Sequence, residues 1–512
     1  MMTLMKPCFS TSLAFASLLL TIAALPGRAD VRLPKIIASH MVLQQQKPLA
    51  IWGWADPGEK VIVELAGQKV DGITAANGKW NVTLAPIKTG GPFKMSFQGR
   101  NRIELDDILI GEVWICSGQS NMEMPVGNSY RPRVYPGVLN FQKELTSAND
   151  PKLRLFLPDH QTSLAPKDDL PGMGWQLCTP ESAGRFSAVG YFFGRHIRQT
   201  CQVPVGVISV AKSSSTAQAW TSLEALRAIP EIAKVLDRRE THPPPPMKPS
   251  SNPEDAAITP PTVEIPFSEP GSLYNGMIAP LVPLSLRGVI FYQGESNTSS
   301  ARGYRKFFPT LIRSWRKSFA QGDFPFLYVQ LAALGNIPKT ANQDPGWASL
   351  REVQTETLAE PNTGMAVAID IGSVSQIHPP NKQEVGRRLG LLAEAIAYGR
   401  KIPCEGPRYR SSRIEGGSIR IQFDHAGAGL VAKPFERGKP PVTVDQLVGF
   451  AVAGADKLYH WADARIDGNE VIVSSPQVSA PVSIRYAWHS NPEANLYNPA
   501  GLPAVPFRTD KD

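Results

Sequence analysis

The 512-residue chain has few cysteines, and after the apolar run near its start it has no other long apolar run. Both absences limit the kinds of protein that it can be. After the first thirty residues, no stretch offers the ~20 consecutive apolar residues that a membrane-spanning helix needs. The 5 cysteines and 8 histidines form no cluster with zinc-site spacing, so we expect neither a metal nor another cofactor. Lysine and arginine exceed the acidic residues by 8 but form no dense run, so nucleic acid is not predicted as a partner.

Residues 1–29 have the organisation of an export signal. Lys6 supplies the positive start, residues 13–25 are apolar, and Gly27-Arg28-Ala29 is typical of a cleavage site between small residues. We therefore expect export to the periplasm or the cell exterior. Cys178 and Cys201 could pair in an oxidising compartment, although their spacing does not decide it. The sequence gives no indication of the oligomeric state.

The rest of the chain divides into three regions of different pattern. Residues 30–105 carry short strand patterns separated by turns such as Asn77-Gly78, which is typical of a small β-sandwich. Residues 405–512 are β-rich again and predict a second accessory sandwich. Between them, residues 106–404 contain a proline-rich stretch at about 242–270, which we interpret as an inserted surface loop.

The middle region alternates buried strands with helical patterns. This alternation predicts an α/β domain with a parallel sheet and helices on both faces. The expected strands are 108–116, 205–211, 288–292, 326–331 and 365–371, and the expected helices are 187–200, 304–319, 349–359 and 382–398.

Three loops that follow these strands carry polar groups. Ser120 comes just after the first strand and the turn at Gly118, Asn297 follows the strand 288–292, and His378 follows the strand 365–371. Because the carboxyl ends of parallel strands meet at one edge of a sheet, we expect the three residues to converge there. A serine, a general base and an amide donor in one place are what acyl transfer requires.

These motifs, in this order, resemble those of the sialate O-acetylesterase family of SGNH-type carbohydrate esterases. The resemblance covers nearly the whole chain after the export signal. It implies a three-layer, flavodoxin-like SGNH-hydrolase sheet flanked by N- and C-terminal β-sandwich domains. The matching blocks are residues 41–44, 52–53, 111–122, 273–281, 292–297, 377–388 and 491–503.

The resemblance also implies roles for single residues. Ser120 matches the nucleophile, and His378 matches the base that takes its proton and passes it to the leaving sugar hydroxyl. The side-chain amide of Asn297 and the backbone N–H of Ser120 match oxyanion donors. Ser214 stands where the family usually carries a glycine that supplies a third backbone donor. A serine keeps that N–H provided the position needs no positive φ.

One departure from the family pattern concerns the histidine. SGNH enzymes commonly carry an aspartate three residues before it, and this chain has Ser375 there. Loss of the acid that orients such a histidine costs a factor of roughly 10⁴ in the serine proteases. Asp370, Glu295 or a backbone carbonyl could hold the imidazole of His378 instead.

Four polar residues near the expected site are candidates for substrate binding. Polar side chains at strand ends equally often satisfy nearby backbone groups, and the sequence favours neither reading. The four residues are Gln119, Asn121, Gln293 and Glu295.

We therefore expect a secreted serine esterase that removes acetyl groups from a carbohydrate. O-acetylated sialic acid is the substrate that the resemblance implies, and acetylated xylan, xyloglucan or pectin is the alternative. An alternative of another class is a carbohydrate-binding protein with a degenerate esterase site, suggested by Ser375 and the serines at 213–215. A lipase-like esterase is disfavoured because no apolar lid pattern is present.

Overall fold

The computed structural model describes residues 30–129, 134–241, 265–343, 345–434 and 446–510. The predicted export signal at 1–29 lies outside the described residues. So does most of the proline-rich insertion, of which only residues 265–270 are described.

A seven-strand path forms the central sheet, in the order β13-β12-β11-β7-β10-β8-β9. Its neighbours are parallel except for the antiparallel edge pair β8 and β9. The order β10-β7-β11-β12-β13 is the 2-1-3-4-5 order of flavodoxin-like sheets, so the predicted fold class is confirmed. The strands are β7 (Arg102–Gly118), β8 (Asp150–Pro158), β9 (Gly172–Cys178), β10 (Val205–Ala211), β11 (Gly288–Tyr292), β12 (Phe326–Gln330) and β13 (Thr363–Val367).

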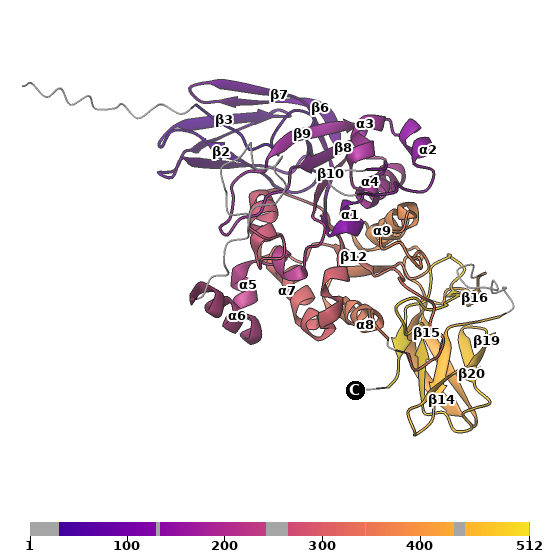
Figure 1. The fold of residues 1–512 in the computed structure, drawn as a ribbon. Coiled ribbons are helices and arrows are strands. Elements are labelled where there is room, and N and C mark those ends of the chain that lie inside the picture. Colours follow the sequence, from indigo (N-terminus) through magenta and orange to yellow (C-terminus); the bar gives the residue numbers. More distant parts are fainter. Residues whose placement is uncertain (1–29, 130–133, 242–264, 344, 435–445, 511–512) are drawn as a thin grey trace, which may run out of the picture.

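Helices cover both faces of this sheet. Helices α4 (Ala188–Cys201) and α9 (Lys382–Ile396) pack side by side, with α7 (Ala301–Phe319) and α8 (Ala348–Glu356) across from them (Figure 1). Trp114 of β7 meets Phe193 of α4 at 4.9 Å between ring centroids, whereas Phe291 of β11 stacks on Phe308 of α7 at 5.7 Å. The two aromatic contacts lie on opposite faces and close a three-layer core.

Strand β7 belongs to two regions at once. Its first half pairs with β6 and β1 of the N-terminal region, and its second half pairs with β10 and β11. The boundary expected between residues 105 and 106 therefore falls inside a single 17-residue strand. The other N-terminal strands are β1 (Val42–Gln44), β2 (Leu49–Trp54), β3 (Lys60–Leu65), β4 (Gln68–Ile73), β5 (Lys79–Leu84) and β6 (Gly90–Gln98).

The C-terminal region is rich in antiparallel sheet, as predicted. Two four-stranded sheets have the orders β14-β15-β20-β19 and β18-β17-β21-β23, and β16 pairs with β22. These strands are β14 (Arg408–Glu415), β15 (Ser418–Asp424), β16 (Val431–Ala432), β17 (Phe450–Ala453), β18 (Tyr459–Trp461), β19 (Asp463–Asp467), β20 (Glu470–Ser474), β21 (Ser483–Tyr486), β22 (Leu496–Tyr497) and β23 (Phe507–Arg508).

Short helices fill the connections between these elements. They are α1 (Ser120–Glu123), α2 (Phe141–Thr146), α3 (Pro180–Arg185), α5 (Leu223–Arg227), α6 (Pro230–Thr241), the 3₁₀ turns η1 (Ala217–Trp220), η3 (Ala279–Leu281), η4 (Glu295–Ser300) and η5 (Thr357–Ala359), and the π turn η2 (Tyr274–Ile278).

The sequence pattern missed β8 and the edge strand β9. Arg154 interrupts the apolar run of β8, but its guanidinium is buried against the Asp107 carboxylate at 2.7 Å and needs no solvent. The strand expected at 365–371 begins at Thr363 and ends at Val367, because the chain turns there toward the loop that carries His378.

The four described cysteines are free thiols, so Cys178 and Cys201 do not pair. Cys116 of β7 is fully buried, and burial raises the pKa of its thiol to about 12. Among the described helices, none combines the length and apolar character required to cross a bilayer.

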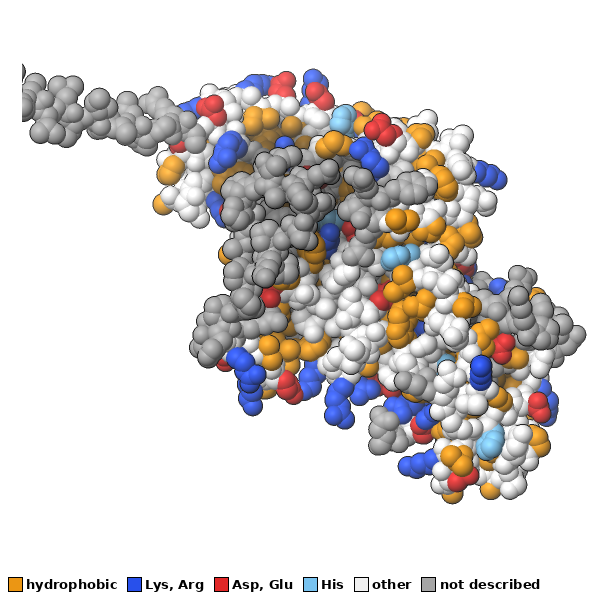
Figure 2. Space-filling view, in the orientation of Figure 1, with side chains coloured by type: hydrophobic (Ala, Val, Ile, Leu, Met, Phe, Trp, Pro, Cys, Tyr) orange, Lys and Arg blue, Asp and Glu red, His pale blue; other side chains and the backbone are white. Residues whose placement is uncertain are grey.

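The outer face of α7 carries ion pairs to the neighbouring helices. Lys306 and Lys317 pair with Glu231 and Glu224 of the neighbouring helices. Figure 2 shows blue Lys and Arg side chains along the lower edge of the molecule, with a few red Asp and Glu side chains among them.

Candidate active site

The turn after β7 places Ser120 at the carboxyl edge of the sheet. Gly118 has φ +134°, and a Cβ there would lie 2.1 Å from the carbonyl oxygen of Tyr292 in β11. Only glycine fits this close approach. The Gln119 N–H donates to the same oxygen at 2.9 Å, and α1 then begins at Ser120, whose side chain is buried apart from 4% of its surface.

Asn297 enters the site from η4, directly after β11. Its Oδ1 accepts from the Ala217 N–H at 3.0 Å and from Gln293 Nε2 at 2.7 Å. Its Nδ2 donates one hydrogen to Gln218 Oε1 at 3.0 Å. Because an amide nitrogen carries two hydrogens, one donor of Asn297 is left for an oxyanion.

The loop after β10 is held by its own serines. The Ser213 N–H donates to Glu123 Oε2 at 2.6 Å, and Ser215 Oγ donates to the Lys212 carbonyl at 2.7 Å. Ser214 is exposed at the tip with φ +60°. The position therefore does require a positive φ, which a serine was expected to avoid. The residue adopts the left-handed conformation at a cost of roughly 1–2 kcal/mol, and its N–H is retained.

His378 lies in the loop between β13 and α9, half-buried against Tyr135 at 5.0 Å between ring centroids. The preceding carbonyl, of Ile377, accepts a 2.9 Å hydrogen bond from Asn121, the neighbour of Ser120. Within the described residues no hydrogen bond joins the Ser120 and His378 side chains. In unliganded active sites, catalytic hydrogen bonds are often long or poorly aligned and tighten only when substrate binds.

A chain of contacts connects this histidine with the serine loop. The Tyr135 and Ser213 hydroxyls are hydrogen-bonded at 2.8 Å, and Ser213 also donates its hydroxyl to Glu123. Glu123 and Tyr135 line a cleft of about 550 Å³ together with His160 and Lys212. The sequence carries no signal for a role of Tyr135, which lies between unrelated motifs.

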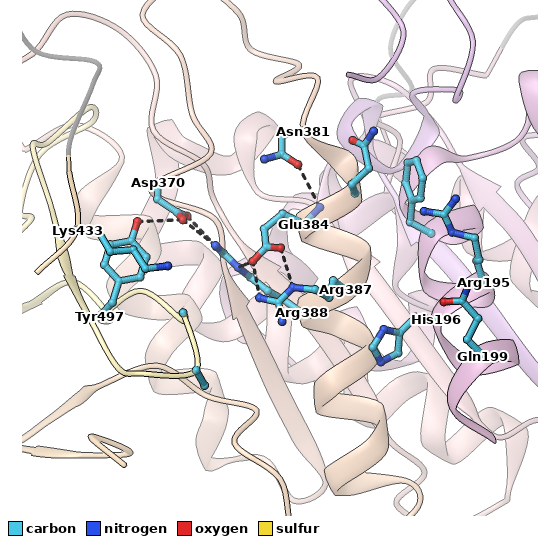
Figure 3. A pocket seen from close by; sticks show the side chains of 14 residues that line it. Arg195, His196, Gln199, Asp370, Asn381, Glu384, Arg387, Arg388, Lys433 and Tyr497 are labelled. Atoms are coloured by element: carbon cyan, nitrogen blue, oxygen red, sulfur yellow. Dashed lines mark hydrogen bonds and ion pairs between the residues drawn. The ribbon is translucent and has the colours of Figure 1, made fainter. Parts of the chain in front are cut away.

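Neither candidate acid contacts His378 by a hydrogen bond among the described residues. Both carboxylate oxygens of Asp370 accept from Arg388 at 2.7 Å, and Tyr497 donates to one of them at 3.1 Å (Figure 3). This group lines a separate cavity of about 750 Å³ between α4, α9 and the C-terminal region, and neither Ser120 nor His378 lines it. Burial acts to raise the pKa of Asp370, but the Arg388 guanidinium overcomes it and holds that pKa below its usual value.

Glu295, the other candidate acid, lies beside the nucleophile turn. Its Oε1 accepts from Asn121 Nδ2 at 2.5 Å. Burial raises the pKa of this carboxyl group.

The other two candidates for substrate binding, Gln119 and Gln293, form hydrogen bonds between the loops. Gln119 Oε1 accepts from the Ser296 N–H at 3.1 Å and from Gln293 Nε2 at 3.2 Å. Gln293 also donates to Asn297, so both glutamines satisfy local groups at the strand ends. Among the described residues, no group of three or more histidine, cysteine or acidic side chains is placed to hold a metal ion.

Comparisons with known proteins agree with this arrangement. A family model described as "Carbohydrate esterase, sialic acid-specific acetylesterase" matches residues 261–395, which include Asn297 and His378. The chain is similar to sialate O-acetylesterases of Mus musculus (31% identity, 96% of this chain and 97% of that protein) and Homo sapiens (32%, 93% and 92%). Its structure is similar to a carbohydrate acetylesterase from Xanthomonas citri, with a TM-score of 0.80 and 35% identity over 94% of this chain and all of that one.

We predict that Asp370→Asn weakens the fold more than the chemistry. Neutralising one partner of a buried ion pair costs about 3–5 kcal/mol of unfolding free energy, whereas kcat per folded molecule should stay within a few-fold of wild type. Because the folded pKa of Asp370 lies below its unfolded value, this stabilisation is present above pH ~4 and is lost as the pH falls through the folded pKa. Urea unfolding at several pH values and kcat at a temperature where both proteins are folded would measure the two effects. A loss of several orders of magnitude in kcat with a stable fold would instead make Asp370 the acid of the histidine.

We also predict opposite effects of two substitutions at Ser214. Ser214→Gly relieves roughly 1–2 kcal/mol of backbone strain and keeps the N–H donor. The greater conformational freedom of glycine in the unfolded chain offsets about 0.5–1 kcal/mol of this gain. Its turnover should match or exceed that of wild type. Ser214→Val places a β-branched residue at positive φ, so the loop should shift and turnover should fall. Equal turnover of the glycine and valine variants would show that this N–H takes no part in the reaction.

Proposed function

Because the chain belongs to the sialate O-acetylesterase family of carbohydrate esterases, and is therefore a carboxylic ester hydrolase, we propose an exported enzyme that removes O-acetyl groups from a carbohydrate through an acyl-serine intermediate. The observation that supports this most is the meeting of three loops: Ser120 and Asn297 follow the adjacent strands β7 and β11, and Asn121 is bonded to the loop of His378.

In the proposed reaction, Ser120 Oγ attacks the carbonyl carbon of the acetyl group while His378 takes the hydroxyl proton. The negative charge that develops on the carbonyl oxygen is bound by the backbone N–H groups of Ser120 and Ser214 and by Asn297 Nδ2. Each such donor is worth roughly 10²–10³ in rate. The bond to the sugar oxygen then breaks, and His378 returns the proton to that oxygen. A water molecule, deprotonated by His378, then attacks the acetyl-serine. The bond to Ser120 Oγ breaks, acetate leaves, and His378 returns the proton to Ser120 Oγ.

The cleft beside the site is where we propose that the sugar binds. It is bordered by Tyr135, His160 and Lys212, which combine an aromatic ring with polar and cationic groups. This lining suits a hydroxylated ring better than an acyl chain. Export is proposed on residues 1–29 alone, and a mature N-terminus at Asp30 would verify it.

We predict that Ser120→Ala abolishes hydrolysis of an aryl acetate without unfolding the protein, because the proposed acyl intermediate forms on the Ser120 hydroxyl. His378→Ala should be nearly as damaging, since residues that act as a unit fail together. Turnover would be measured with the aryl acetate and then with acetylated sialic acid, xylan, xyloglucan and pectin, alongside circular dichroism of each variant. Inactive wild-type protein that still binds these sugars would favour a carbohydrate-binding protein. Active, well-folded Ser120→Ala would contradict the mechanism.

A further inference from the structure

A fully buried lysine lies behind the nucleophile turn. Lys382 is the first residue of α9, four residues after His378, and it has no exposed surface. Its ammonium donates to Asn121 Oδ1 at 2.5 Å and lies 5.2 Å from the centroid of the Tyr292 ring. A cation in the first turn of a helix is opposed by the helix dipole, so neither burial nor helix stability explains this lysine.

Asn121 connects the lysine with the histidine loop. With its Oδ1 bound by Lys382, its Nδ2 donates to Glu295 Oε1 at 2.5 Å and to the Ile377 carbonyl at 2.9 Å. The amide therefore has three partners on three different segments and cannot rotate without losing all of them. This fixed side chain belongs to the residue next to Ser120 and bonds the residue next to His378.

The cluster carries a considerable electrostatic cost. Burial lowers the pKa of Lys382 to about 7 and raises that of Glu295. Glu295 Oε2 is buried with no hydrogen-bond partner among the described residues. Two buried ionisable groups, one of them with an unsatisfied oxygen, give less stability than apolar side chains of the same volume. Such groups are expected where function requires them.

We propose that Lys382 is a positioning residue of the esterase reaction: it fixes Asn121, and through Asn121 it holds the Ile377 carbonyl and hence the His378 imidazole beside Ser120. Glu295 balances the lysine charge and anchors the same amide. The cluster thus replaces, through the backbone of the histidine loop, the aspartate that is missing at position 375. The proposal rests on the esterase function proposed above.

The test is a double-mutant cycle between Lys382→Met and His378→Ala. Methionine keeps the length and apolar stem of lysine and removes only the ammonium. In the wild-type background, misplacement of the histidine should lower kcat about 10²-fold on an aryl acetate, with KM changed less than about threefold. In the His378→Ala background the same substitution should lower kcat no further, because it acts only through the histidine.

Lys47→Met is the matched control. Lys47 is partly buried, and its ammonium donates to the Leu286 carbonyl at 2.7 Å, far from the nucleophile turn. The Lys47→Met substitution should change the unfolding midpoint and leave kcat unaffected in both the wild-type and the His378→Ala backgrounds. A Lys382→Met effect that multiplies with that of His378→Ala would overturn the proposal, as would a change in stability without a change in kcat.

A second variant decides the matter if Lys382→Met does not fold. Asn121→Ala removes the link between the lysine and the Ile377 carbonyl without adding charge. It should lower kcat by a similar factor and be equally silent in the His378→Ala background, whereas additive loss there would contradict the proposal. Failure of the esterase assignment looks different, since wild-type protein would then show no turnover that depends on Ser120.

Discussion

The parallel pairing of β7 with β10 and β11 is the constraint on which the site depends. Its register places Gly118 opposite both Ala211 and Tyr292, so three strands end at the same level. The segments that follow carry Ser120, Ser214 and Asn297, and hydrogen bonds such as the one from the Ala217 N–H to Asn297 Oδ1 join them. The missing Cβ of Gly118 allows the nucleophile turn to lie against β11. A backbone hydrogen-bond ladder thus fixes the catalytic geometry, and side chains refine it.

Electrostatics divides the acidic groups near the histidine loop into two roles. Asp370 and Arg388 form a strong, satisfied pair that ties the start of the loop to α9 and, through Tyr497, to the C-terminal region. Glu295 and Lys382 both bond Asn121 behind the nucleophile, and Oε2 of Glu295 has no hydrogen-bond partner among the described residues. The first arrangement stabilises a fold, whereas the second keeps two ionisable groups out of water at a cost. The Arg388 guanidinium therefore separates the structural acid from the acid near the chemistry: it holds the pKa of Asp370 below its usual value, whereas burial raises the pKa of Glu295.

Much of this organisation was predictable from local pattern. Apolar runs followed by loops that carry Ser120, Asn297 and His378 sufficed to predict the strands. Their common edge was predictable because the carboxyl ends of parallel strands meet at one edge of a sheet. The partner of Asp370 was not predictable, since Arg388 lies on a helix 18 residues away and only packing of α9 brings it back. The left-handed φ of Ser214 was not predictable either, because a serine gives no indication of the positive φ that a glycine there would suggest. Lys382 did leave a signal, as a lysine at the start of a helix, but its burial depends on tertiary contacts.

Trapping the intermediate is the most direct test of the central claim, that Ser120 carries the acetyl group during turnover. Wild-type enzyme mixed with excess aryl acetate would be quenched in acid within the first turnovers and digested for mass spectrometry. The account predicts an acetyl group on the peptide that contains Ser120, together with a burst of released phenol equal to the enzyme concentration when deacylation is slow. Rapid turnover with no acetylated Ser120 under conditions where a burst is observed, or acetylation at another residue, would contradict it.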